Sequence, residues 1–168
     1  MTASDQNLMR AFQQMQQAVK ESIGDSKPYS YGVGISFVTF VFVTTKQVAD
    51  EGRLTVNGEI AQKDAVTSSP LSITQSEIDP QKDGTDQVKA TLRHLRNCVA
   101  HGSWLYDPAN KTPSGDILID LFDHNTSEAQ RFSARIPFPD LVNLAEKIMV
   151  ETFNDLACSP ETPTPVSP

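Results

Sequence analysis

This chain of 168 residues contains few cysteines and has no excess of positive charge. It contains two cysteines, Cys98 and Cys158, too few for the disulfide framework that stabilises small secreted domains. No signal peptide precedes the first polar residues, so we expect a reducing, cytoplasmic location. The formal net charge of −7 argues against a broadly basic surface that coats nucleic acid, but it leaves room for a local basic site.

The chain also lacks a long apolar run. The longest, VGISFVTFVFV at residues 33–43, falls well short of the roughly 20 residues that a membrane-spanning helix needs. We therefore assign this run to the core and expect no association with a membrane. Its β-branched and aromatic residues favour a strand, yet it continues into a segment typical of a helix end, so the residues alone leave both structures open.

Three segments show the periodicity of amphipathic helices. One follows Ser4, which can cap it, and ends near Gly24. The second covers about 85–101, with Gly102 at the position where a helix stops. The third covers 140–156 and starts after a proline. The apolar face of this third helix consists of Leu141, Leu144, Ile148, Met149 and Phe153.

The remaining segments are polar or alternate in hydrophobicity. Residues 52–83 are polar and rich in turn-forming residues, which predicts a long surface excursion with short ordered pieces at most. Two short alternating runs around a polar turn predict a small β-hairpin at about 116–136. We thus expect a single domain at 1–158, followed by a disordered, proline-rich tail at 159–168.

The segment LRHLRNCVAHGSW, residues 92–104, concentrates arginine, histidine and asparagine near the end of the second helix. At 100° per residue, its narrow apolar stripe consists of Val88, Leu92, Leu95 and Val99. Arg96 lies on the flank of this stripe, while Arg93, Asn97 and His101 lie on the opposite side. We therefore expect these polar side chains to point away from the core of the domain, toward water or toward a partner.

Such residues do not by themselves define a site. Arginine and histidine near the C-terminus of a helix interact favourably with its dipole, and an arginine followed five residues later by a histidine is common by chance. A site is favoured by the combination of Arg96-Asn97 with His101-Gly102. It is also favoured by a local excess of basic residues, five against three acidic, between Lys82 and Lys111.

The stretch RNCVAH, residues 96–101, resembles the R-x4-6-H motif of the HEPN superfamily, in the form with asparagine directly after arginine. The segments GDILIDLF and PFPDLVNLAEKIM that follow are similar to those of bacterial members, so the resemblance covers roughly 85–156. It implies an all-helical bundle and therefore favours a helix for 33–43. The expected fold is a mainly α, HEPN-like helical bundle with the hairpin as an insertion.

The resemblance implies metal-independent RNA cleavage, without a cofactor, at a site shared between two protomers. In this chemistry the RNA 2′-OH attacks the adjacent phosphate. Arg96 would clamp the phosphate oxygens, His101 would transfer protons, and Asn97 would orient the histidine or the phosphate by hydrogen bonding. Arg93 and His94 would extend the surface that binds the nucleic acid.

Partners follow from the same resemblance. RNA would be the substrate, a second copy would bind through the motif-bearing helix, and an antitoxin or another regulatory protein is a further candidate partner in a toxin or antiviral defence system. The alternative is a non-catalytic helical module that forms the same dimer and binds RNA or protein. The arginine, asparagine and histidine together favour the nuclease, since a module without catalysis has no evident need for all three.

Overall fold

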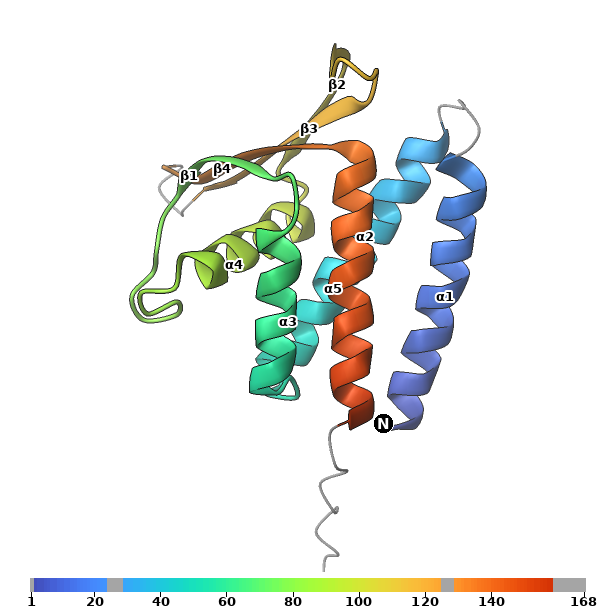
Figure 1. Ribbon diagram of the computed structural model, residues 1–168, viewed down its shortest axis with the longest axis vertical. Helices are drawn as coiled ribbons and strands as arrows, with labels where there is room; N and C mark the ends of the chain where they lie inside the picture. Colours follow the sequence, from blue (N-terminus) through green and yellow to red (C-terminus); the bar gives the residue numbers. More distant parts are fainter. Residues whose placement is uncertain (1, 24–28, 125–128, 159–168) are drawn as a thin grey trace, which may run out of the picture.

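The computed structural model describes residues 2–23, 29–124 and 129–158, so the predicted tail at 159–168 lies outside the described residues. The described part is mainly helical with a small antiparallel sheet (Figure 1). The helices are α1 (Ala3–Ile23), α2 (Tyr29–Asp50), α3 (Val56–Thr67), α4 (Gln87–Ala100) and α5 (Phe138–Cys158). The strands are β1 (Ser72–Ser76), β2 (Trp104–Lys111), β3 (Ile117–His124) and β4 (Gln130–Pro137).

Helix α5 is the central element of the helical part. It contacts α2 and α3, and the Phe153 ring lies 5.6 Å from that of Phe12 on α1. The sheet lies across one end of these helices, and α4 runs beneath it (Figure 1). The predicted apolar face of α5 is confirmed, because all five of its residues are buried. The predicted extents of α1, α4 and α5 are confirmed to within a few residues.

The apolar run at 33–43 lies in α2, which confirms the helix that the resemblance favoured. By length and composition alone this helix could cross a membrane. In the structure it instead contacts α1, α4 and α5, and it contributes Phe37, Val38, Val41 and Phe42 to the core. Its residues are apolar around much of the circumference because neighbours cover it on several sides.

The first helix begins differently from the prediction. Ser4 lies inside the first turn of α1, and Thr2 takes the capping position instead. The Thr2 hydroxyl accepts a hydrogen bond from the Asp5 amide, and the Asp5 carboxylate accepts one from the Thr2 amide (3.2 and 2.8 Å). This reciprocal pair is a capping box, which satisfies two of the donors that a helix start leaves free.

The prediction for 52–83 was wrong, because this segment contains the 12-residue helix α3. Thr55 caps α3, and the Asp155 carboxylate on α5 accepts a hydrogen bond from the Thr55 amide at 2.7 Å. The helix carries few apolar residues, and one of its buried positions is the polar Gln62. Contacts with α5 rather than a local hydrophobic pattern thus stabilise α3.

The predicted hairpin is confirmed as β3 and β4, but the sheet is larger than predicted. Its strand order is β1-β4-β3-β2, with every pair antiparallel. The outer strands β1 and β2 are almost entirely exposed, so they lack the alternation of buried and exposed residues that reveals a strand in a sequence. Strand β2 follows α4 directly and pairs with β3, which places the end of the motif beside the sheet.

Two glycines of α2 provide a matched test of its packing on α5. A Cβ atom added at Gly34 would lie 2.3 Å from Cζ of the buried Phe138, whereas one added at Gly32 would meet nothing within 4 Å. We expect Gly34→Ala to lower the free energy of unfolding by about 1–3 kcal/mol through overpacking. Gly32→Ala should raise it by about 0.5–1 kcal/mol because alanine favours helix. Urea unfolding followed by circular dichroism measures both, and equal effects would contradict this packing.

Candidate active site on helix α4

Helix α4 lies between the other helices and the sheet. It contacts α2 and α3 on one side and β3 and β1 on the other. Three residues of the predicted apolar stripe, Leu92, Leu95 and Val99, are buried, but Thr91 and His94 are buried as well. The prediction that the polar side chains Arg93, Arg96, Asn97 and His101 point away from the core was wrong in part, because Asn97 points to the sheet, where it binds Asp123.

The Asp123 carboxylate on β3 binds two side chains of α4. Its Oδ2 lies 2.8 Å from Nδ1 of His94 and accepts a hydrogen bond from Nδ2 of Asn97 at 3.0 Å. The second ring nitrogen of His94 lies 2.8 Å from the Glu77 carbonyl oxygen, and the ring stacks on Phe132. His94 has no exposed surface. In this arrangement it joins α4 to the sheet and presents nothing to a nucleic acid.

Arg93 is also engaged within the chain. Its Nε and Nη2 donate to the two oxygens of the buried Asp83 at 2.9 and 2.7 Å, and Nη2 also donates to the Glu77 carbonyl. The hydrogen bonds from Arg93 hold the pKa of Asp83 below its ordinary value of 3.8. This bidentate pair fastens the loop before α4 to the helix, so the Arg93 guanidinium already has a carboxylate partner.

Arg96 points to the opposite side of α4, toward α3. Its Nη2 donates to Oε1 of the buried Gln62 at 2.7 Å. Gln62 in turn donates to the Thr152 hydroxyl on α5 at 2.8 Å. Within the described residues no carboxylate lies at ion-pair distance from Arg96, and its buried Nε has no hydrogen-bond partner. Burial lowers the pKa of Arg96 to about 10, so the side chain remains charged at neutral pH.

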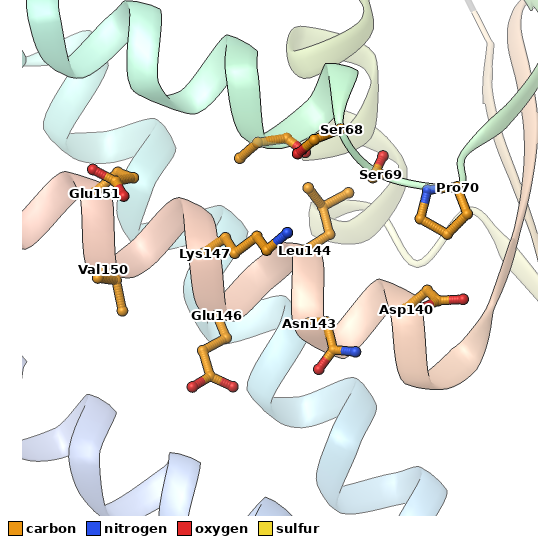
Figure 2. A pocket seen from close by; sticks show the side chains of 11 residues that line it. Ser68, Ser69, Pro70, Asp140, Asn143, Leu144, Glu146, Lys147, Val150 and Glu151 are labelled. Atoms are coloured by element: carbon orange, nitrogen blue, oxygen red, sulfur yellow. The ribbon is translucent and has the colours of Figure 1, made fainter.

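A cavity of about 360 Å³ opens beside Arg96, between the end of α2, α3, α4 and the loop before α4. Its lining includes five basic and three acidic side chains. The basic ones are Lys63, Lys82, Lys89, Arg93 and Arg96, and the acidic ones are Asp50, Glu59 and Asp83. A second hollow of about 500 Å³ lies between α3 and α5 and contains none of the motif residues (Figure 2).

His101 caps the C-terminal end of α4 and is exposed. Its amide donates to the Asn97 carbonyl at 3.0 Å, and Gly102, at φ 64°, turns the chain toward β2. The imidazole forms no side-chain hydrogen bond or ion pair with the part of the chain that the structure describes. His101 therefore stands free at the surface, five residues or about 7.5 Å along the helix axis from Arg96.

The three motif side chains thus diverge from one helix. Arg96 reaches toward α3, Asn97 toward β3, and His101 toward the surface, and no hydrogen bond joins any two of these side chains in the described structure. Sequence reasoning missed the partners Gln62 and Asp123, because neither stands near the motif in the chain. Among the described residues, no group of three His, Cys, Asp or Glu side chains could hold a metal ion.

The family comparison agrees with the motif. A model of the family described as HEPN pEK499 p136 matches residues 1–156, which confirms the resemblance that the RNCVAH stretch suggested. The chain is thus a mainly helical protein with a small sheet, and it belongs to this HEPN family. Neither the curated proteins nor the solved structures contain a significant match.

The buried pair of Arg93 and Asp83 predicts a specific response to acid. Because the folded pKa of Asp83 lies below 3.8, its contribution to stability is complete above that value and is lost as the pH falls through the folded pKa. Asp83→Asn should therefore be less stable than wild type at about pH 7, and its stability should change less on acidification toward about pH 3. Urea unfolding across this range measures both effects.

The control for this experiment is Asp120→Asn. Asp120 pairs with Arg135 on the sheet surface, at 2.6 Å, where both side chains are at least one-third exposed. Such a pair contributes about 0–1 kcal/mol. If both variants lost the same free energy at neutral pH, burial of the Asp83 pair would not be the cause.

Proposed function

We propose that this protein is a metal-independent endoribonuclease whose active site includes Arg96, Asn97 and His101. One observation carries the proposal. A single helix presents a charged arginine with no counter-ion and, five residues later, an exposed histidine whose ring forms no hydrogen bond in the described structure. Membership of the HEPN family supports it.

The residue types suit cleavage by an internal nucleophile. The 2′-OH loses its proton and forms a bond to phosphorus, the bond from phosphorus to O5′ breaks, and O5′ gains a proton. The products are a 2′,3′-cyclic phosphate and a 5′-OH. His101 would transfer protons, since imidazole titrates near neutrality. Arg96 would stabilise the more negative phosphorane through its planar fork of donors.

Asn97 would contribute through position rather than proton transfer. Its Nδ2 is bonded to Asp123, which holds the side chain one turn before His101. The amide is thereby kept at one place beside the end of α4, where it can orient the phosphate or the histidine by a further hydrogen bond.

The reaction needs a base and an acid, and we propose that two copies of the chain share the site. A symmetric dimer would bring a second His101 and a second Arg96 to the first pair. Because most of α4 is covered, the interface would lie at its exposed C-terminal end and not along its length. The exposed Leu105 and Tyr106 on β2 follow closely and offer apolar surface for such a contact.

In the cell, we propose that the protein acts in the cytoplasm as a toxin or an antiviral effector, controlled by an antitoxin or another regulatory protein. A second candidate function is a non-catalytic dimer that binds RNA or protein. It is favoured by the hydrogen bonds of Arg96 to Gln62 and of Asn97 to Asp123, which already give two motif residues a structural role.

The decisive experiment compares RNA cleavage in EDTA by wild type, His101→Ala and Arg96→Ala. We expect His101→Ala to lower the cleavage rate by about 10²–10⁴-fold, since it removes the proton-transfer group. Arg96→Ala should lower the rate by about 10²–10³-fold. Arg96→Lys keeps the charge but loses the planar fork, so it should remain slow. The wild-type products should carry cyclic-phosphate ends.

His124→Ala is the matched histidine control. His124 is exposed, and its ring contacts Phe122, which places both on the sheet face opposite to Asp123 and α4. The His124→Ala variant should cleave at the wild-type rate, and circular dichroism should show every variant folded. An inactive wild type, or a His101→Ala variant as fast as wild type, would contradict the nuclease and favour the binding module. An active enzyme that light scattering shows to be a monomer would contradict the shared site.

A further inference from the structure

The cavity beside Arg96 contains positive charge that the chain does not neutralise. Three of its five basic side chains form ion pairs: Lys63 with Asp86 (2.6 Å), Lys82 with Asp79 (3.5 Å) and Arg93 with Asp83 (2.7 Å). Arg96 and Lys89 form none with the described residues. These two residues lie seven positions apart, two helical turns, so they occupy the same side of α4.

The acidic side chains of the cavity are for the most part already paired. Asp50 pairs with Lys46, and Asp83 pairs with Arg93. Glu59 is exposed. Burial lowers the pKa of Arg96 and the negative charges of Glu59 and Asp50 oppose this shift, but neither carboxylate forms an ion pair with Arg96 in the described structure. The cavity therefore keeps a net positive charge after its internal pairs are formed, although the whole chain has a net charge of −7.

The guanidinium of Arg96 is held in place before any ligand arrives. Its Nη2 is bonded to Gln62, Gln62 to Thr152, and the Thr152 hydroxyl donates to the Ile148 carbonyl at 2.7 Å. Gln62 and Thr152 have no exposed surface, so this chain of hydrogen bonds is anchored in the core. The remaining donors of Arg96 include the buried Nε, which is costly to leave without an acceptor.

We propose that this cavity binds a phosphate group, with Arg96 and Lys89 as its ligands and Gln62 as the residue that positions Arg96. A phosphate supplies the acceptor oxygens that the guanidinium fork lacks and the negative charge that the cavity lacks. The volume of about 360 Å³ suits a nucleotide-sized group and is too small for a folded RNA.

The phosphate is assigned to the backbone of a single RNA strand, and this assignment rests on the proposed function, in which Arg96 binds the same strand. Lys89 is exposed, so a strand can reach this ligand of the cavity from solvent. A free nucleotide carries the same phosphate chemistry and is tested as a separate arm.

The test measures binding to a probe that cannot be cleaved. A short, dye-labelled 2′-O-methyl RNA lacks the nucleophile, and its affinity is measured by fluorescence anisotropy at several salt concentrations. The second arm measures the binding of adenosine monophosphate by calorimetry. We expect Lys89→Ala to weaken binding of the RNA probe by about tenfold and to reduce the slope of log affinity against log salt by about 0.7, the loss of one phosphate contact.

Gln62→Glu tests the positioning role with almost no change in shape. It places a carboxylate at the guanidinium, where it competes with the phosphate, so we expect at least tenfold weaker binding and a lower salt slope, with circular dichroism showing that the variant is folded. The matched control is Lys147→Ala. Lys147 is an exposed lysine in the α3–α5 hollow (Figure 2), and its loss should leave the affinity for the RNA probe unchanged.

The outcomes separate this inference from the proposed function. Weaker binding by Lys89→Ala and Gln62→Glu, with the control unchanged, supports the phosphate site even if wild type cuts no RNA. If both variants bind the RNA probe as tightly as wild type does, the phosphate site is overturned even if wild type is an active nuclease. It is also overturned if wild type binds neither the RNA probe nor the mononucleotide. Binding of the RNA probe alone assigns the phosphate to the strand, while equally tight binding of the mononucleotide overturns that assignment.

Discussion

The buried carboxylate of Asp123 determines how helix α4 sits in the fold. Two side chains of α4, one turn apart, bind the same Oδ2 atom, and one of them is the fully buried His94. A buried carboxylate or imidazole without partners costs several kcal/mol, so only one rotation of α4 about its axis is acceptable. That rotation turns Arg96 away from the sheet, toward α3, and leaves His101 at the surface. The whole candidate site therefore depends on an interaction with β3, outside the motif.

Hydrogen bonds on its other sides hold α4 in the same orientation. Arg93 binds Asp83 in the preceding loop, and Arg96 binds Gln62, which is itself bonded to α5. A helix held in this way presents its functional groups at fixed positions, which is what electrostatic stabilisation of a transition state requires. The polar residues of the motif region thus divide into those that hold the helix and those that remain available, with Arg96 belonging to both groups.

The sequence was sufficient to predict the helices and strands that have a strong hydrophobic periodicity, and few others. Helices α1, α4 and α5 each bury one apolar stripe, and β3 and β4 alternate buried residues with more exposed ones, so all five were predictable. Helix α2 is apolar on several sides and needed the family resemblance. Helix α3 and the edge strands β1 and β2 depend on partners distant in the chain, so no local pattern revealed them.

The candidate site shows the same division. The residue types and the motif were visible in the sequence, but the directions of the side chains were not. A helical wheel assumes one buried face, whereas α4 is covered from two sides, and its second buried face is polar. His94 looked like a surface residue because its partner, Asp123, is 29 positions further along the chain. A polar residue without a local partner carries no signal of its burial.

The placement of the histidines bears on whether one chain could act alone. The sequence contains three. His94 has both ring nitrogens occupied and no exposed surface, and His124 lies on the face of the sheet opposite to α4. His94 and His101 both belong to the helix of Arg96, but of these two only His101 has a ring that is exposed to solvent and substrate. If RNA cleavage uses one histidine as base and another as acid, the second must come from another copy of the chain. In the proposed nuclease, the dimer would then follow from the proton chemistry as well as from the family resemblance.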